Sequence, residues 1–171
     1  MKSIYMMAAC VALAGCVSKP DNVIPVTPFN SGLYLGKWYE IARLDHRFER
    51  GLSQVTAEYS MRPDGGIKVI NRGFDQANSA WKQSEGKAYF VGATDTAYLK
   101  VSFFGPFYGA YIVFDLDPQY RVSMVSGPDT SYLWILSRTP AIDAAAKARL
   151  VAKAKALGYA TDKLIWVAQK T

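Results

Sequence analysis

The chain has 171 residues, half of them hydrophobic, and a formal net charge of +6 from 20 Lys and Arg against 14 Asp and Glu. This is the length of a single domain that can bury a sizeable core. Because the basic residues are scattered along the chain and form no cluster, we do not expect nucleic-acid binding.

The N-terminus has the pattern of an export signal. Lys2 precedes an apolar run, and small residues lead up to Cys16; this segment is too short to span a bilayer. The sequence therefore predicts a signal peptide over residues 1–15, and the alternative is a plain secretory peptide in which Cys16 is incidental. Cleavage would remove Cys10 and leave no disulfide in the mature chain.

Residues 17–30 are rich in Ser, Pro, Asp, Asn and Thr and show little periodicity. Such a composition is typical of a linker, so we expect a tether over residues 16–30 that holds a globular domain, residues 31–171, off a membrane.

From Trp38 onward, short runs of alternating apolar and polar residues recur between turn residues. Gly36 permits a tight turn into the first run, in which Trp38, Glu40 and Ala42 would share one face. Seven further strands are expected at residues 55–61, 67–74, 81–91, 98–104, 110–116, 120–126 and 132–137. Residues 141–157 are Ala- and Lys-rich with helical spacing and end at Gly158, and residues 164–168 indicate a ninth strand.

Eight sequential strands with short turns predict an all-β fold. The expected form is an eight-stranded antiparallel up-and-down β-barrel with a C-terminal α-helix and a short ninth strand, because closure removes the exposed edges. Such a barrel can be filled by its own side chains or hold one small ligand. The alternative is a β-sandwich, which normally needs crossing connections that the sequence does not indicate.

Alternation also predicts an inner wall, although a slip of one residue would invert the two faces. The candidate pocket residues are Val55, Tyr59, Leu99, Val101, Phe103, Ile112, Phe114, Met124 and Trp134. A large apolar cavity with few polar groups suits an acyl chain. The alternative for each of these residues is ordinary packing in a filled core.

The loop over residues 45–52 would lie at the end of the barrel away from Trp38. It carries Arg47 and Arg50, which could hold a phosphate group at the rim or could pair with acidic residues of the same loop. Phe104, Phe107 and Tyr108 would form an aromatic cluster at this rim, in a loop bounded by glycines. That cluster either packs on itself or meets a membrane or a second subunit.

Two further polar residues have structural interpretations. Glu40 would point inward with Trp38, where an unpaired carboxylate is costly, so we expect an Arg, a Tyr or water beside it. His46 is the only histidine and lies in a loop, a poor setting for a general base or a metal site. With no nucleophile beside a base and no cluster of metal ligands, the sequence predicts no catalytic residue, no metal and no cofactor.

Several motifs resemble those of the lipocalin family, and of the bacterial outer-membrane lipocalins in particular. Gly36-Lys37-Trp38 matches the first signature, Gly-x-Trp, and Arg138 matches the third, in which an Arg packs across that Trp. Leu13-Ala14-Gly15-Cys16 resembles the lipobox of bacterial lipoproteins. The second signature, Thr-Asp-Tyr, is degraded and keeps only Asp117 and Tyr120. Further runs that resemble the bacterial branch are residues 45–51, 102–109 and 132–138.

The resemblance implies that Cys16 is lipidated and that Trp38 and Arg138 plug one end of the barrel. Val17 stands where inner-membrane retention would place an Asp, so the expected location is the periplasmic side of the outer membrane. The implied function is non-enzymatic: storing or transporting fatty acids, lysophospholipids or phospholipids in the cavity, in envelope maintenance. The alternatives are a carrier of pigments or other ring-shaped hydrophobic ligands, and an enzyme built on the same barrel. A homodimer through the aromatic rim is left open.

Overall fold

The computed structural model describes residues 17–170, so the predicted signal peptide and Cys16 lie outside the described residues. In chain order the elements are α1 (Ser31–Tyr34), β1 (Gly36–Arg43), β2 (Leu52–Met61), β3 (Ile67–Asp75), β4 (Ala80–Phe90), β5 (Tyr98–Phe104), β6 (Phe107–Leu116), β7 (Val122–Ser126), β8 (Leu133–Ser137), α2 (Ala144–Ala156), the 3-10 turn η1 (Thr161–Lys163) and β9 (Ile165–Trp166).

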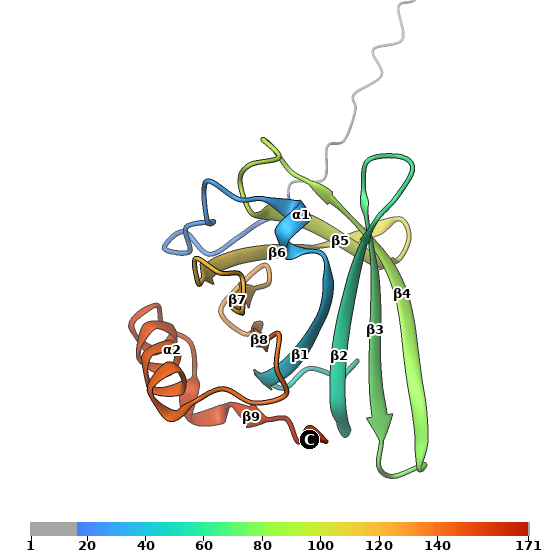
Figure 1. The fold of residues 1–171 in the computed structure, drawn as a ribbon, viewed down its shortest axis with the longest axis vertical. Helices are drawn as coiled ribbons and strands as arrows, with labels where there is room; N and C mark the ends of the chain where they lie inside the picture. Colours follow the sequence, from blue (N-terminus) through green and yellow to red (C-terminus); the bar gives the residue numbers. More distant parts are fainter. Residues whose placement is uncertain (1–16, 171) are drawn as a thin grey trace, which may run out of the picture.

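The strands close into a barrel, shown in Figure 1 with α2 lying against its side. Successive strands from β1 to β8 pair antiparallel, and β1 pairs with both β2 and β8, which closes the circle. β9 pairs with the last two residues of β1. The predicted eight-stranded barrel with a C-terminal helix and a ninth strand is therefore confirmed, with a shorter ninth strand than expected.

The connections between strands alternate between the two ends of the barrel. Residues 44–51, 76–79, 105–106 and 127–132 connect strands at one end, which we call the mouth. The start of β1 and the end of β8 lie at the opposite end, which we call the closed end. β6 begins at Phe107, so the loop predicted around Gly105 to Gly109 is shorter than expected.

The segment predicted to be a tether instead packs onto the barrel. Val23 is fully buried and Phe29 is 5% exposed. The backbone of Val26 bonds to β6 and to the residue before β5: its N–H donates to Val113 O (2.9 Å) and its carbonyl accepts from Ala97 N (2.9 Å). The composition of residues 17–30 resembles a linker, but these few apolar side chains and backbone hydrogen bonds close the end of the barrel.

Two separate apolar clusters hold the fold together. One fills the barrel interior around Trp38, Tyr59 and Leu99. The other lies between the outer wall of the barrel and α2, and includes Leu150 and Ala154 of that helix. Among residues 17–170, neither helix is both long and apolar enough to cross a membrane.

α2 is fixed at its start and along its length by carboxylates. The Asp143 side chain caps it by accepting from Ala146 N at 2.7 Å. Asp115 on β6 accepts from Arg149 (3.0 Å) and Lys153 (2.6 Å), which draws the helix onto the barrel wall.

A bulge in β1 changes which side chains point inward. The pairing of β1 with β8 shifts register between Glu40 and Ala42, and an extra residue in a strand reverses the alternation of faces beyond it. Ala42 consequently lies in the cluster under α2 and does not share the Trp38 face as predicted. Arg43 instead lies beside Glu40.

Candidate functional site

The closed end is sealed by a stacked pair. The Arg138 guanidinium lies 4.0 Å from the centre of the Trp38 ring, and the indole is fully buried. The guanidinium nitrogens of Arg138 donate to four backbone carbonyls, those of Leu33, Leu35, Lys37 and Tyr120. The predicted packing of Arg138 across Trp38 is present, and it also fastens α1 to the barrel.

Above this plug, three tyrosine hydroxyls meet inside the barrel. Tyr111 Oη lies 2.9 Å from Tyr34 Oη and 2.8 Å from Tyr59 Oη, and Ser123 Oγ is 3.2 Å from Tyr34 Oη. Burial raises the pKa of Tyr34 to about 12 and raises the pKa values of Tyr59 and Tyr111 well above their ordinary value. The hydroxyls therefore stay neutral and form a polar floor in an otherwise apolar interior.

The inner wall contains most of the predicted pocket residues. Tyr59, Leu99 and Val101 line a cavity of about 20 Å³, room for about one water molecule. Phe103 and Trp134 pack against the interior cluster, and both are half-buried. Val55 is buried at the inner face, where a β-carbon at Gly73 would meet its Cγ2 at 3.2 Å.

Ile112, Phe114 and Met124 are not in the pocket. They lie in the cluster between the barrel and α2, and Phe114 stacks on Tyr159 at 5.8 Å. Strands β6 and β7 are covered on both faces, so both faces are apolar. The sequence pattern therefore does not show which side chains point into the barrel. A register shift between Val113 and Asp115 further interrupts the alternation of β6. The inward residues are Tyr111, Val113 and Val125 instead.

Toward the mouth, two buried carboxylates lie near one buried guanidinium. Arg43 Nη1 donates to Glu40 Oε1 at 2.6 Å, and its Nη2 donates to the carbonyl of Glu49 at 2.8 Å. The Glu49 carboxylate accepts from Trp134 Nε1 at 3.0 Å. Glu40 thus has an Arg beside it, one of the three kinds of partner that were expected. Trp134 is held by a hydrogen bond as well as by packing.

The charges of this cluster do not balance if both carboxylates are ionised. Burial and the nearby Glu49 raise the pKa of Glu40 well above 4.5, and burial raises the pKa of Glu49. Two carboxylates that share one cation in a poorly solvated site are expected to hold a proton between them. The mouth therefore presents a polar, partly neutralised group above an apolar wall.

His46 has the structural role expected of it. Its ring stacks on Phe48 at 4.4 Å and on Tyr132 at 5.7 Å, and it is 7% exposed. Burial and the Arg43 charge lower its pKa to about 4, so it is neutral near pH 7. Within residues 17–170, no group of three His, Cys, Asp or Glu side chains is arranged to hold a metal ion.

The predicted rim residues separate into different environments. Arg50 forms a bidentate pair with Asp45, with Nη2 to Oδ2 at 2.6 Å, and Arg47 is exposed. Phe104 and Phe107 are 79% and 77% exposed at the mouth. Tyr108 does not join them, because it packs on the outer wall beside Tyr89 and under Lys100.

Several site residues had no signal in the sequence. Arg43 follows Glu40 by three positions, which places the two on opposite faces of a regular strand; only the bulge brings them together. Glu49 was expected only as an acidic residue that could pair with the arginines of its loop, whereas the fold buries it. Tyr34 belongs to a four-residue helix that was not predicted.

Comparison with known proteins agrees with this geometry. A family model described as a lipocalin-like domain matches residues 30–169. The outer membrane lipoproteins Blc of Vibrio cholerae and Escherichia coli K12 are each 53% identical to this chain. Each alignment covers 99% of this chain, and it covers 100% of the Vibrio protein and 98% of the Escherichia protein. Temperature-induced lipocalin-1 of Arabidopsis thaliana is 36% identical over 81% of the chain and 78% of its own length.

Solved structures share the fold at lower identity. The cockroach allergen Per a 4 superposes with a TM-score of 0.69 at 21% identity, over 90% of this chain and 96% of the allergen. Insecticyanin from the tobacco hornworm Manduca sexta superposes with a TM-score of 0.69 at 20% identity, over 90% of this chain and 88% of the insecticyanin chain.

The full-length identity to the two Blc proteins is far above what fold likeness alone produces, so the protein is, like them, a lipid-anchored lipoprotein of the outer membrane. The barrel, the Trp38–Arg138 plug and the match over residues 30–169 lead to one conclusion. The chain belongs to the lipocalin family.

Proposed function

We propose that this protein binds fatty acids, lysophospholipids or phospholipids in the barrel interior and stores or carries them at the outer membrane. Lipidation at Cys16 would hold it on the periplasmic side, and no covalent chemistry is involved. The proposal extends the outer-membrane lipoprotein assignment, to which the full-length Blc relatives lend support.

The observation that carries the proposal is the incomplete covering of the inner wall. Val101, Phe103 and Trp134 all pack against the interior cluster, yet each is only partly buried. Apolar side chains inside a closed sheet can reach solvent only if the space between them opens outward, here through the mouth. An acyl chain would cover these surfaces, with a gain of about 25 cal/mol for each Å² removed from water.

The polar groups fit a ligand with one polar end. The cavity beside the tyrosine floor, about 20 Å³, is too small for an acyl chain, so the ligand must displace side chains there or stop above it. At the mouth, the exposed Arg47 would meet a carboxylate or phosphate head group, whereas Arg43 is buried and already engaged by Glu40. Arg50 contributes less, because Asp45 already engages its guanidinium.

Two substitutions at neighbouring positions test the proposal. Val101→Trp would fill the interior, whereas Lys100→Trp places the same side chain on the outer wall, where Lys100 now lies over Tyr108. Binding of a fluorescent fatty acid and of lysophosphatidylcholine should be lost in the first protein and kept in the second. Equal affinity in both proteins would show that the acyl chain does not enter the barrel.

A further inference from the structure

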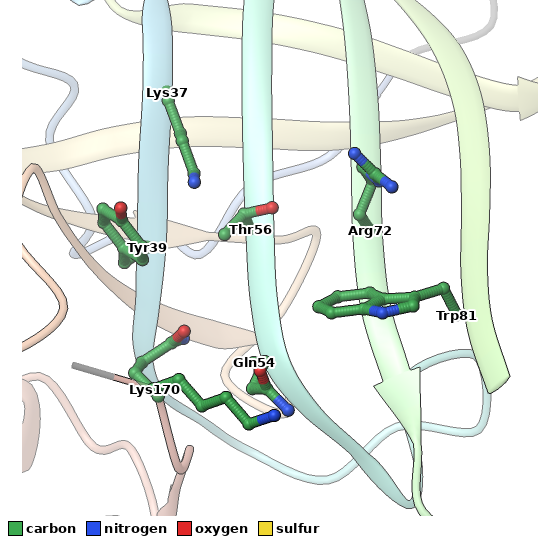
Figure 2. Close-up of a pocket in the computed structure, with 8 residues that line it drawn as sticks. Lys37, Tyr39, Gln54, Thr56, Arg72, Trp81 and Lys170 are labelled. Carbon is green, nitrogen blue, oxygen red and sulfur yellow. The ribbon is translucent and has the colours of Figure 1, made fainter. Parts of the chain in front are cut away.

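A second concavity lies on the outer wall of the barrel, away from the interior site. It has a volume of about 260 Å³ and spans β1 to β4 beside the C-terminal segment, as Figure 2 shows. We call it the outer groove. Its lining residues are Lys37, Tyr39, Gln54, Thr56, Arg72, Trp81, Gln169 and Lys170.

The groove exists because β1 and β2 separate. They pair only from Gly36 to Tyr39 on β1, and beyond that point the C-terminal segment fills the gap between them. Gln54 N donates to Ala168 O at 2.7 Å, and the Gln169 side chain donates to Glu40 O and Val55 O at 2.8 and 2.9 Å. The floor of the groove is therefore held in place by hydrogen bonds from both strands.

The groove gathers three cations that form no ion pair with the described residues. Lys37, Arg72 and Lys170 come from three separate parts of the chain, and no carboxylate lines the groove. None of the three forms an ion pair within residues 17–170, although Glu58 is the cross-strand neighbour of Lys37. Elsewhere on this wall, Lys68 is paired with Glu85.

The remaining groups offer complementary contacts. The Trp81 indole is 54% exposed, and the Arg72 guanidinium lies 5.7 Å from its centre. In Figure 2, Lys37 points down from the upper end of the groove and Lys170 lies across its lower end beside Gln54, with Thr56 between the two ends. The groove thus combines cations, neutral hydrogen-bonding groups and a flat apolar surface.

We propose that the outer groove binds a phosphate ester. Phosphate matches a cluster of unpaired cations, and an arginine can hold two of its oxygens at once. The volume is just below the range of pockets that enclose drug-sized ligands. It suits a phosphate with a few attached carbons, in which Trp81 packs against the organic part. This site is independent of the acyl site inside the barrel.

Glycerol 3-phosphate is a suitable probe of this size. Titration calorimetry on the chain from Val17 to Thr171, which contains the entire described fold, should show binding that weakens as salt is added. Arg72→Gln should reduce the affinity about tenfold, the effect of losing a charge-assisted hydrogen bond. Lys37→Gln should reduce it by a smaller factor.

Lys100→Gln is the matched control, because Lys100 also lies over a ring on the outer wall but outside the groove. Its affinity for the probe should equal that of the unchanged protein, as should that of Val101→Trp. The proposal is wrong if millimolar glycerol 3-phosphate gives no binding, or if Lys100→Gln loses as much affinity as Arg72→Gln. Failure here with acyl binding intact would leave the interior site unaffected.

The phosphate ester could belong to a lipid head group or to a soluble molecule. Vesicles of phosphatidylcholine containing phosphatidic acid should sediment with the protein, and Arg72→Gln should reduce this, if the groove accepts lipid head groups. If only glycerol 3-phosphate depends on Arg72, the natural ligand is soluble. Equal loss of sedimentation in Arg72→Gln and Lys100→Gln would mean general charge attraction and would contradict a lipid site in the groove.

Discussion

Arg138 and Trp38 lie one above the other, 4.0 Å apart, and the guanidinium also donates to four backbone carbonyls. The arginine therefore does two things that a lysine cannot do together: it covers an aromatic face and spreads its donors in a plane. Loss of either residue should weaken the closed end as a unit.

Trp38→Ala should lower the free energy of unfolding by about 3–5 kcal/mol, the usual cost of truncating a buried tryptophan. Arg138→Lys keeps the charge and should still cost about 1.5–3 kcal/mol, because a lysine cannot replace the fork of donors. Urea unfolding with and without a bound fatty acid would measure both. Unchanged stability with lost binding would instead assign Trp38 to the ligand site.

Phe103→Ala and Phe114→Ala make the same change on opposite sides of the wall. Phe114 is 5% exposed under α2, so its removal should cost about 3–5 kcal/mol and leave fatty-acid affinity unchanged. Phe103 faces the interior and is half-buried, so its removal should cost less stability and change the affinity. Fluorescent fatty-acid titrations and thermal melts of both proteins would decide between these faces, and the reverse pattern would overturn the placement.

A chain that begins at Ser31 tests the packed N-terminal segment. It would lose Phe29, Val23 and the two backbone hydrogen bonds of Val26. The free energy of unfolding should fall by more than about 3 kcal/mol relative to a chain that begins at Val17. Circular dichroism melts of the two chains are sufficient. Equal melting temperatures would show that residues 17–30 are dispensable, as a tether would be.

Glu40→Gln tests the shared proton at the mouth. A carboxyl whose folded-state pKa is raised stabilises the fold below its unfolded pKa, and that contribution is lost as pH rises through the folded pKa. The Glu40 carboxyl should thus lower the free energy of unfolding of the unchanged protein at pH 8 relative to pH 4. Glu40→Gln removes one buried charge while an amide oxygen still faces Arg43.

We therefore expect Glu40→Gln to gain stability relative to the unchanged protein between pH 5 and pH 8, by on the order of 1 kcal/mol for each pKa unit of the shift. The difference between the two proteins is the quantity to compare, because carboxylates with a lowered pKa change in the opposite sense. Asp75, with its pKa lowered to about 2, stabilises the fold near neutral pH and loses this stabilisation on acidification. A difference that does not vary with pH would contradict the shared proton.

The sequence was sufficient for the barrel but not for the faces of every strand. The outer walls of β2 to β5 are solvated, so alternation there places Tyr59, Leu99 and Val101 correctly. β6 and β7 are covered by α2, so Ile112, Phe114 and Met124 satisfy the same pattern while pointing the other way. Residues whose partners depend on a bulge, such as Arg43 and Glu40, cannot be paired from spacing alone.

The packed N-terminal segment also fixes where the described chain begins on the barrel. Val17 lies beside Tyr98 at the start of β5, where the Tyr98 hydroxyl donates to its carbonyl, so the described chain begins at the closed end. If Cys16 carries a lipid, as we propose, the anchor immediately precedes Val17 in the sequence. The leaflet that holds the protein would then lie against the closed end, and the mouth, with Phe104 and Phe107 exposed, would open in the opposite direction. A ligand would enter and leave on the side turned away from the membrane that anchors its carrier, and the two phenylalanines would be free to meet a second surface.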